Sequence, residues 1–329
     1  MPYCGASVLH CDIPVRFDTS RGGCDFQCSY CSEMVHGRFN PRPFESWKSL
    51  ESFIKGARNA DTNWVNPDWR IPLHFGVLSD PLPRSDKQTR RSYKALYTFA
   101  EYGYPFILTT KSTLVVDAEY LGLLSQCNSV IQVSMISKSF SAKYEHNAPS
   151  YRERFAMLYR LARNVKRLVV RSQPFVVGYL DELIAMIPAY KSSGVYAILV
   201  GGISLRRPLG NINVRTGDGY VYRGEVLHEA LETIRDCCHA NDLEFLTCES
   251  ESADLSDSLT CCGCEGLEGF AVNKCNLSYD FENYVNDTMK LEGTGQVFRS
   301  GTRDSRFKYS SYIDVIRRFY HDGNDGLVK

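Results

Sequence analysis

The feature that most constrains the fold is a regular alternation of strand-like and helix-like segments through the first two thirds of the chain. The apolar runs expected to form strands are residues 8–17, 71–78, 105–110, 130–136, 167–177 and 195–200. The amphipathic segments expected to form helices are residues 43–54, 87–102, 117–124, 150–164 and 180–191. Alternation at this spacing is typical of parallel βα units. We therefore expect an α/β protein built on a parallel sheet.

The alternating pattern ends near Ser204, after six units. Six units fit a partial (β/α)6 barrel better than a closed barrel of eight, so we expect one domain over residues 1–205. Residues 206–329 are expected to form an extension with a polar segment, a helix over 223–240, a short strand over 243–247 and a helix over 310–320. Because βα barrels carry their chemistry on the loops that follow the strands, those loops are the first place to look for a site.

Charge and hydropathy narrow the class of protein. The chain has 38 basic and 38 acidic residues, and this neutral balance argues against strong non-specific binding to duplex nucleic acid. It does not exclude a nucleotide or a local contact with DNA. No stretch approaches the roughly 20 apolar residues of a membrane helix, and residues 1–17 do not resemble a secretion signal. We expect a cytoplasmic protein without a membrane segment.

Thirteen cysteines are many for a cytoplasmic chain. Disulfides are disfavoured in that compartment, so clustered cysteines there more often bind metal or do redox chemistry. Two groups are clustered, one over residues 24–31 and one over residues 248–275. The remaining cysteines lack ligand spacing and are expected to be small buried side chains; they are Cys4, Cys11, Cys127, Cys237 and Cys238.

The first group has the spacing C-x3-C-x2-C and follows the first expected strand. Three thiolates from one short loop, here Cys24, Cys28 and Cys31, can hold three corners of a [4Fe-4S] cluster and leave the fourth iron without a protein ligand. A zinc knuckle is the competing interpretation, and it would need a fourth ligand such as His36. The βα alternation that follows the loop favours the cluster.

This loop, with the aromatic Tyr30 just before its last cysteine, resembles the signature of the radical S-adenosylmethionine (SAM) superfamily. The resemblance implies that SAM chelates the open iron, that an electron from the reduced cluster breaks a C–S bond of SAM, and that the 5′-deoxyadenosyl radical so formed abstracts hydrogen from a substrate. It also implies that Tyr30 lies near the adenine. An electron donor such as flavodoxin or ferredoxin is the expected partner.

The loops after the next three strands indicate a branch of that superfamily. They read Ser79-Asp80-Pro81, then Thr110-Lys111-Ser112, then Val133-Ser134-Met135-Ile136. This pattern resembles the spore photoproduct lyase-like branch, over about residues 10–205. The resemblance implies that Ser79, Lys111 and Ser134 contact SAM, and a cation with hydroxyls suits a carboxylate and a ribose.

Four further residues are candidates for binding the cofactor. Asp80 is expected to add a polar contact to the same site. Arg171, on the fifth expected strand, either reaches the site or forms a structural ion pair. Gly201 and Gly202 end the sixth strand, where they either allow the adenine to approach closely or simply turn the chain.

One position departs from the branch. Spore photoproduct lyases carry a cysteine immediately before the serine of the second-strand loop, as a hydrogen-atom donor, and this chain has Leu78 there. A leucine cannot return a hydrogen atom as a thiol can. We therefore expect a rearrangement or modification, by an isomerase, a lyase or another modifying enzyme, and not photoproduct repair.

The second cysteine group supplies five candidate ligands. Cys248, Cys261, Cys264 and Cys275 are the predicted set, with Cys262 as a substitute. Three interpretations stay open, namely an auxiliary iron–sulfur cluster, a structural zinc site and unligated thiols. The position in a C-terminal extension resembles that of auxiliary clusters in many radical SAM enzymes.

The sequence thus supports two enzyme hypotheses and one alternative. The leading hypothesis is a radical SAM enzyme that acts on a thymine-type nucleobase, or on its substituent, in DNA or a nucleotide. The second is modification of a peptide or protein with the help of an auxiliary cluster. The third is an iron–sulfur or zinc module that is not an enzyme, which the barrel-like alternation disfavours.

Overall fold

The computed structural model describes residues 3–4, 15–31, 39–58, 69–205, 207–208, 210, 212–216, 219–258 and 260–271. Its centre is a sheet with the strand order β1-β2-β5-β6-β7-β8-β9-β12. Strand β1 is antiparallel to β2, and every other neighbouring pair is parallel. The strands are β1 (Tyr3–Cys4), β2 (Val15–Phe17), β5 (Leu73–Phe75), β6 (Phe106–Thr110), β7 (Ser129–Ser134), β8 (Arg167–Phe175), β9 (Ala197–Gly202) and β12 (Glu244–Thr247). The predicted α/β class with a parallel sheet is confirmed.

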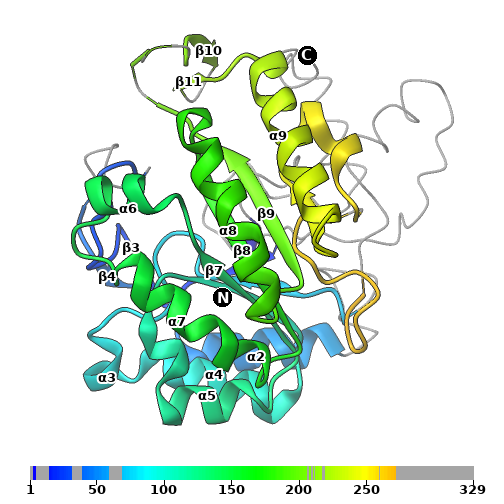
Figure 1. The fold of residues 1–329 in the computed structure, drawn as a ribbon. Coiled ribbons are helices and arrows are strands. Elements are labelled where there is room, and N and C mark those ends of the chain that lie inside the picture. Colours follow the sequence, from blue (N-terminus) through cyan, green and yellow to red (C-terminus); the bar gives the residue numbers. More distant parts are fainter. Residues whose placement is uncertain are drawn as a thin grey trace, which may run out of the picture.

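Helices connect these strands and cover one face of the sheet, which we call the outer face; Figure 1 shows α7, α8 and α9 against it. The helices are α2 (Trp47–Arg58), α3 (Asp86–Thr89), α4 (Arg91–Tyr102), α5 (Ala118–Leu124), α6 (Lys138–Tyr144), α7 (Tyr151–Ala162), α8 (Leu180–Ser192) and α9 (Gly224–His239). Two small hairpin-like pairs lie outside the main sheet, β3 (Ser20–Arg21) with β4 (Arg42–Pro43) and β10 (Val214–Thr216) with β11 (Gly219–Val221). The helix α6 was not predicted.

Both faces of the sheet are buried, which explains why its strands are almost continuously apolar. Side chains alternate between the faces, so Leu108 and Val133 pack under the helices. Val130, Val169 and Leu199 belong to a second cluster on the opposite face, which we call the inner face. Part of the inner face is polar instead, and this is where candidate site residues lie.

The sheet continues beyond the sixth predicted strand. Strand β12 pairs in parallel with β9, with Phe245 beside Ile198 and Leu246 beside Leu199. Phe245 packs on the outer face and Leu246 on the inner face. A seventh parallel strand, which the prediction had assigned to the extension, is therefore part of the same sheet as residues 15–202.

The segment predicted as one helix over residues 87–102 is two helices. Arg90 has a left-handed backbone, with φ of 54°, and it ends α3 and begins α4. The carboxylate of Asp86 accepts hydrogen bonds from the backbone N–H groups of Ser92 and Tyr93, at 2.8 and 3.0 Å. These bonds satisfy the free N–H groups of the first turn of α4, which is why the helix can restart there.

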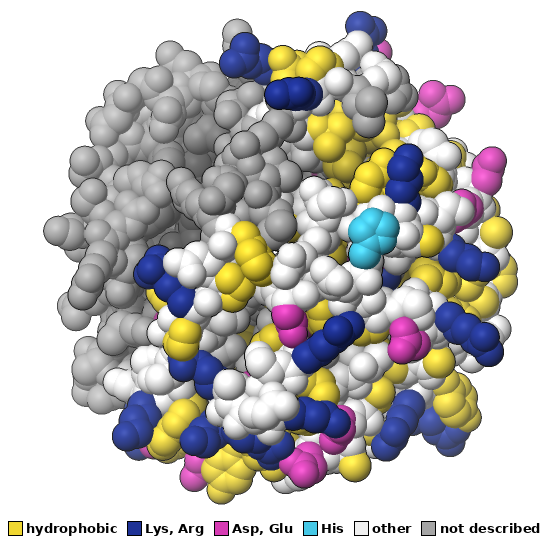
Figure 2. All heavy atoms as spheres, turned by 90° about the vertical axis from the view of Figure 1, so that its left-hand side faces the viewer, with side chains coloured by type: hydrophobic (Ala, Val, Ile, Leu, Met, Phe, Trp, Pro, Cys, Tyr) yellow, Lys and Arg dark blue, Asp and Glu magenta, His cyan; other side chains and the backbone are white. Residues whose placement is uncertain are grey.

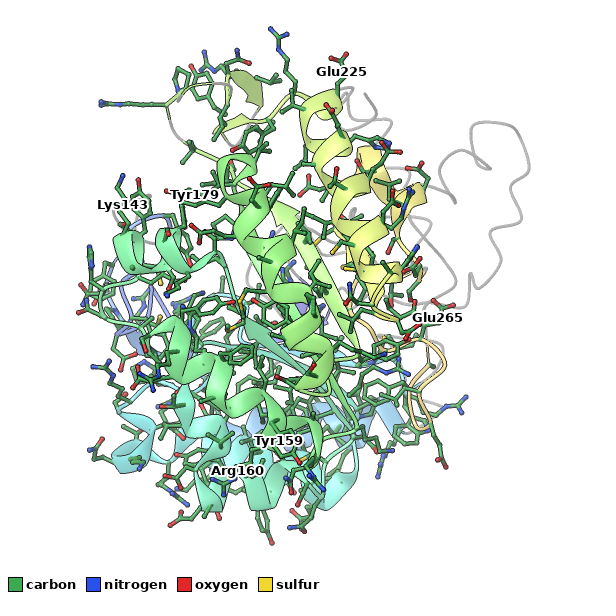
Figure 3. The ribbon with its side chains drawn as sticks, in the orientation of Figure 1. Lys143, Tyr159, Arg160, Tyr179, Glu225 and Glu265 are labelled. Carbon is green, nitrogen blue, oxygen red and sulfur yellow. The ribbon has the colours of Figure 1, made fainter. Side chains whose placement is uncertain are left out.

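The cysteine-rich loop over residues 260–271 crosses the amino ends of the strands. The guanidinium of Arg167, at the start of β8, donates hydrogen bonds to the carbonyls of Gly263 and Glu265, at 2.9 and 2.8 Å. The N–H of Ala271 bonds to the carbonyl of Arg70, before β5, at 2.9 Å. Figure 3 shows Glu265 at the opposite end of the molecule from Tyr179, which precedes α8. The loop therefore covers the inner face from the amino end.

The surface carries both charges. On the face shown in Figure 2, Lys and Arg side chains are scattered among Asp and Glu and do not form one basic stripe. Among the described residues, no helix combines the length and the apolar character needed to cross a membrane.

Candidate functional site

The first cysteine group lies on a loop that reaches over the carboxyl ends of β5 and β6. Cys24 lies close to the backbone of Asp80 and Phe26, and Cys28 lies close to the charged end of Lys111. Two tight turns shape the loop, with Gln27 N–H bonded to the carbonyl of Cys24 at 3.2 Å and Cys31 N–H to that of Cys28 at 2.9 Å. The loop and the Asp80 and Lys111 positions therefore meet, as the sequence predicts.

Burial determines the protonation of the loop cysteines. It raises the pKa of Cys24 to about 12, and the nearby carboxylate of Asp80 adds to the effect. Burial also raises the pKa of Cys28, against the opposing effect of Lys111. Without a bound metal these two cysteines are thiols at neutral pH, so a metal centre must displace their protons.

We expect the rate of cluster assembly on the apo-protein to rise with pH between about pH 7 and pH 9, by up to about tenfold per unit, because the thiolate fraction of Cys24 rises in that proportion. Absorbance of the bound cluster after mixing with iron and sulfide measures the rate. A Cys237→Ser variant, altered outside both cysteine groups, should follow the same profile. A rate independent of pH would show that deprotonation of Cys24 does not limit assembly.

A network of buried charged side chains contacts the cysteine loop. Glu145, whose side chain is fully buried, lies 3.8 Å from Nζ of Lys111 and is paired with Nη2 of Arg154. It also accepts hydrogen bonds from the hydroxyl of Tyr30 and, at 2.7 Å, from Oγ of Ser141. Burial alone would raise the pKa of Glu145, but the charges of Lys111 and Arg154 outweigh this effect. The pKa of Glu145 therefore lies below its ordinary value. Glu145 is therefore an anion that orients two predicted SAM contacts, Tyr30 and Lys111.

The cations of this network are matched by carboxylates. Arg154 and Lys111 face Glu145, and the carboxylate of Asp80 lies close enough to Lys111 for each group to shift the pKa of the other.

The sequence analysis missed Glu145 and Arg154. They flank the start of α7 without any motif spacing, and no pattern in the sequence distinguishes them from surface charges. Arg154 also donates from Nη1 to the carbonyl of Ser134 at 2.6 Å. The network thus connects the cysteine loop to the end of β7.

The residues after β5 have structural partners. The hydroxyl of Ser79 donates to the carbonyl of Ser20 at 3.0 Å and lies 2.7 Å from the hydroxyl of Ser20. The carboxylate of Asp80 accepts from the hydroxyl of Thr110 at 2.8 Å and from the N–H of Lys111 at 2.7 Å. Asp80 therefore connects the loop after β5 to the loop after β6 and fixes the backbone of Lys111. Its contact with a ligand stays a prediction.

The next predicted contacts lie on the inner face. Ser134 ends β7 opposite Arg171 of β8. The guanidinium of Arg171 is bound to Oε1 of Gln132 at 2.8 Å and to the amide oxygen of Gln173. Cys261 and burial raise the pKa of Cys248, and the charge of Arg171 opposes that rise. Contacts with Cys248 and Cys262 lower the pKa of Cys261, and the charge of Arg171 adds to that effect. The structure thus places Arg171 beside the second cysteine group.

The two glycines that end β9 are packed against the protein's own side chains. A Cβ on Gly201 would come within 2.8 Å of the amide of Gln173, and one on Gly202 within 3.1 Å of Leu227. The N–H of Gly202 donates to the carboxylate of Glu249 at 2.7 Å. Close packing is sufficient to explain these glycines, and their contact with an adenine stays a prediction.

The second group is only partly assembled as predicted. Cys248 and Cys261 lie close enough for each to shift the pKa of the other, and Cys261 lies 3.9 Å from Cys262, sulfur to sulfur. Cys264 instead faces the hydroxyl of Thr260 at 3.6 Å. Cys275 lies outside the described residues, as do His36 and the helix predicted over 310–320. Within the described ranges no three His, Cys, Asp or Glu side chains already surround a common metal position.

The loop residues fit the cluster and SAM that the sequence resemblance implies. Three cysteines come from one short loop, the backbone of Asp80 and Phe26 lies close to Cys24, and the largely buried cation of Lys111 lies beside Cys28. Hydrogen bonds to sulfur and nearby charge are the means by which proteins stabilise and tune iron–sulfur centres.

Solved structures of two proteins have the same fold. A spore photoproduct lyase mutant with dinucleoside spore photoproduct matches with a TM-score of 0.58 and 16% identity, over 72% of this chain and 76% of that one. A mutant with bound AdoMet and the same dinucleoside gives 0.57, with the same identity and coverage. Streptococcus suis SuiB bound to S-adenosylmethionine gives 0.50 at 12% identity, over 69% of this chain and 48% of that one. SuiB bound to its precursor peptide SuiA gives 0.50 at 13% identity, over 70% and 47%.

No protein-family model and no curated protein sequence matches this chain. The structural matches confirm the expected partial-barrel architecture of the spore photoproduct lyase type. At this identity they show the shared fold alone.

Proposed function

We propose that this protein is a radical SAM enzyme. The observation that carries the proposal is the convergence of the three-cysteine loop with Lys111 and Asp80 at the carboxyl ends of β5 and β6. That edge is where α/β folds of this kind bind their ligands. The likeness to a fold solved with bound AdoMet supports the same cofactor.

Each residue of the site has a role in this proposal. Cys24, Cys28 and Cys31 hold the cluster, and Lys111 binds the SAM carboxylate, with Glu145 holding its ammonium in place. When bound, the reduced cluster and SAM supply the 5′-deoxyadenosyl radical that abstracts hydrogen from a substrate. The loop is docked by the N–H of Ser29, which donates to the carbonyl of Tyr144 at 3.0 Å.

We propose a thymine-type nucleobase, or its substituent, in DNA or a nucleotide as the favoured substrate. Spore photoproduct lyase, solved with a dinucleoside photoproduct, supports this choice. Leu78 occupies the position of the lyase cysteine, and its N–H is bound to the carboxylate of Asp18 at 2.9 Å. The proposed reaction is therefore a rearrangement or modification, and the absence of a thiol at Leu78 argues against photoproduct repair.

Modification of a peptide is the second candidate function. Its support is the shared fold with SuiB, which was solved bound to its precursor peptide. In either case we propose flavodoxin or ferredoxin as the electron donor, action in the cytoplasm, and a second metal centre in the cysteine group near Cys261.

Formation of 5′-deoxyadenosine by reconstituted, chemically reduced protein tests the proposal. Wild-type protein should cleave SAM, whereas Cys28→Ala should fall to the level of a reaction without protein and Cys237→Ser should match the wild type. Modified thymine-containing DNA should stimulate cleavage more than peptides do. Stimulation by peptides alone would favour the second candidate, and no cleavage by iron-loaded wild type would overturn the proposal.

A further inference from the structure

Four metal-binding side chains form a continuous row on the inner face of the sheet. His74, in the middle of β5, places Nε2 3.2 Å from the sulfur of Cys262. Cys262 lies 3.9 Å from the sulfur of Cys261, and Cys248 lies close enough to Cys261 for each thiol to shift the pKa of the other. The sequence analysis did not single out His74, although a histidine in an apolar strand was a visible signal.

Two of the separations in this row match edges of a tetrahedron around one metal ion. With Zn–S bonds of about 2.3 Å and Zn–N bonds of about 2.0 Å, neighbouring sulfurs lie about 3.8 Å apart and sulfur and nitrogen about 3.5 Å apart. The observed 3.9 and 3.2 Å separations are close to these values. The cysteines of a four-iron cluster sit on different irons and would be spread more widely.

The surroundings of the row also suit such an ion. Three thiolates and a neutral imidazole around Zn²⁺ carry one net negative charge, and the guanidinium of Arg171 lies beside Cys248 and Cys261 to balance it. Leu246 and Val169 pack around the cysteines on the inner face, which excludes competing water ligands. Cys264 is turned toward Thr260 at 3.6 Å and stands apart from the row.

The row must still close around the ion. Among the residues that the structure describes, no three donors yet surround one point. Binding a divalent ion releases the thiol protons and forms metal bonds in their place.

We propose that His74, Cys248, Cys261 and Cys262 bind one structural Zn²⁺ ion. This inference rests on the second metal centre of the proposed function and specifies its ligands and its structural role. His74 belongs to β5, toward one edge of the sheet, Cys248 follows β12 at the other edge, and Cys261 and Cys262 lie on the loop between them. The ion would cross-link the two sides of an open sheet whose described edge strands, β1 and β12, do not pair with each other.

Elemental analysis and thermal unfolding of the full chain test the inference. A Cys24→Ala/Cys28→Ala/Cys31→Ala variant, which cannot hold the first cluster, should retain one zinc per chain. Adding His74→Ala or Cys262→Ser should remove that zinc and lower the unfolding midpoint by roughly 5 °C or more, whereas adding Cys264→Ser should leave the zinc in place. Co²⁺ substituted into otherwise wild-type protein should show tetrahedral thiolate absorption bands that His74→Ala abolishes.

The outcomes separate this inference from the radical chemistry. Zinc retained after His74→Ala but lost after Cys264→Ser would overturn the ligand set. Additional iron with matching sulfide at this site, and no zinc, would overturn the single-ion proposal in favour of a cluster. Failure of wild-type protein to cleave SAM while the His74-dependent zinc persists would overturn only the proposed function.

Discussion

Replacing Arg154 by methionine is expected to lower the free energy of unfolding by about 3–5 kcal/mol. Arg154 is fully buried, and it binds the carboxylate of Glu145, the hydroxyl of Ser141 and the carbonyl of Ser134. Methionine fills a similar volume but leaves Glu145 with Lys111 as its remaining cation, at 3.8 Å. At that distance Lys111 does not replace the direct ion pair, so the buried charge of Glu145 is poorly compensated, which is the source of the large cost.

Chemical denaturation of the wild type and the variant measures this effect. Arg160→Met is the matched control, because Arg160 lies on the same helix and points outward (Figure 3), so its free energy of unfolding should change by less than about 0.5 kcal/mol. A similarly small change for Arg154→Met would show that Glu145 is neutral or hydrated in the folded protein.

The same network gives an expected pH dependence. Since Lys111 and Arg154 lower the pKa of Glu145 in the folded state, the stability that this group contributes is present above its unfolded pKa and is lost as the pH falls through the folded value. The wild type should therefore lose stability in acid. The Arg154→Met variant should lose less over the same range, because its Glu145 pKa is less depressed.

Replacing Lys111 by methionine is expected to weaken SAM binding about 10- to 100-fold, since a hydrogen bond to a charged group contributes about 1.5–3 kcal/mol. The side chain of Lys111 is largely buried, with 16% of its surface exposed, and it lies beside Cys28 and over the ring of Tyr30, 5.8 Å from the ring centroid. Glu145 keeps Arg154 as a partner, so the fold should persist.

Equilibrium binding of SAM to reconstituted protein measures this loss. Lys143→Met is the control, because Lys143 is an exposed lysine on α6 (Figure 3) and should bind SAM like the wild type. Iron content must be equal in the three proteins. If Lys111→Met with full iron content bound SAM as tightly as the wild type, the SAM carboxylate would have to be bound by another cation of the site.

Local patterns predicted most of the elements, and tertiary packing decided the exceptions. Each of the six predicted strands overlaps a strand of the main sheet, because a strand buried on both faces leaves a continuous apolar run. The first prediction, residues 8–17, is described only from residue 15, where β2 covers Val15–Phe17. The break at Arg90 depends on the Asp86 carboxylate. The place of β12 in the sheet depends on pairing with β9, some 47 residues earlier in the chain.

The cysteine loop and the Ser79, Lys111 and Ser134 positions could be found from the sequence because their spacing is local and each follows an apolar strand. Parallel strands bring their carboxyl ends to one edge of the sheet, so spacing along the chain is enough to predict that these residues meet. The three cysteines alone therefore determined the kind of site that we propose.

Only the tertiary structure showed how that site is supported. The contact of Glu145 and Arg154 with the loop, and of His74 with Cys262 across 188 positions, depends on which side chains the folded sheet brings together. Such contacts join residues that share no spacing, because a buried charge or thiol needs only a partner nearby in space. For that reason the sequence identified the loop that holds the proposed cluster, whereas the folded chain decided which residues orient it and where a second metal would bind.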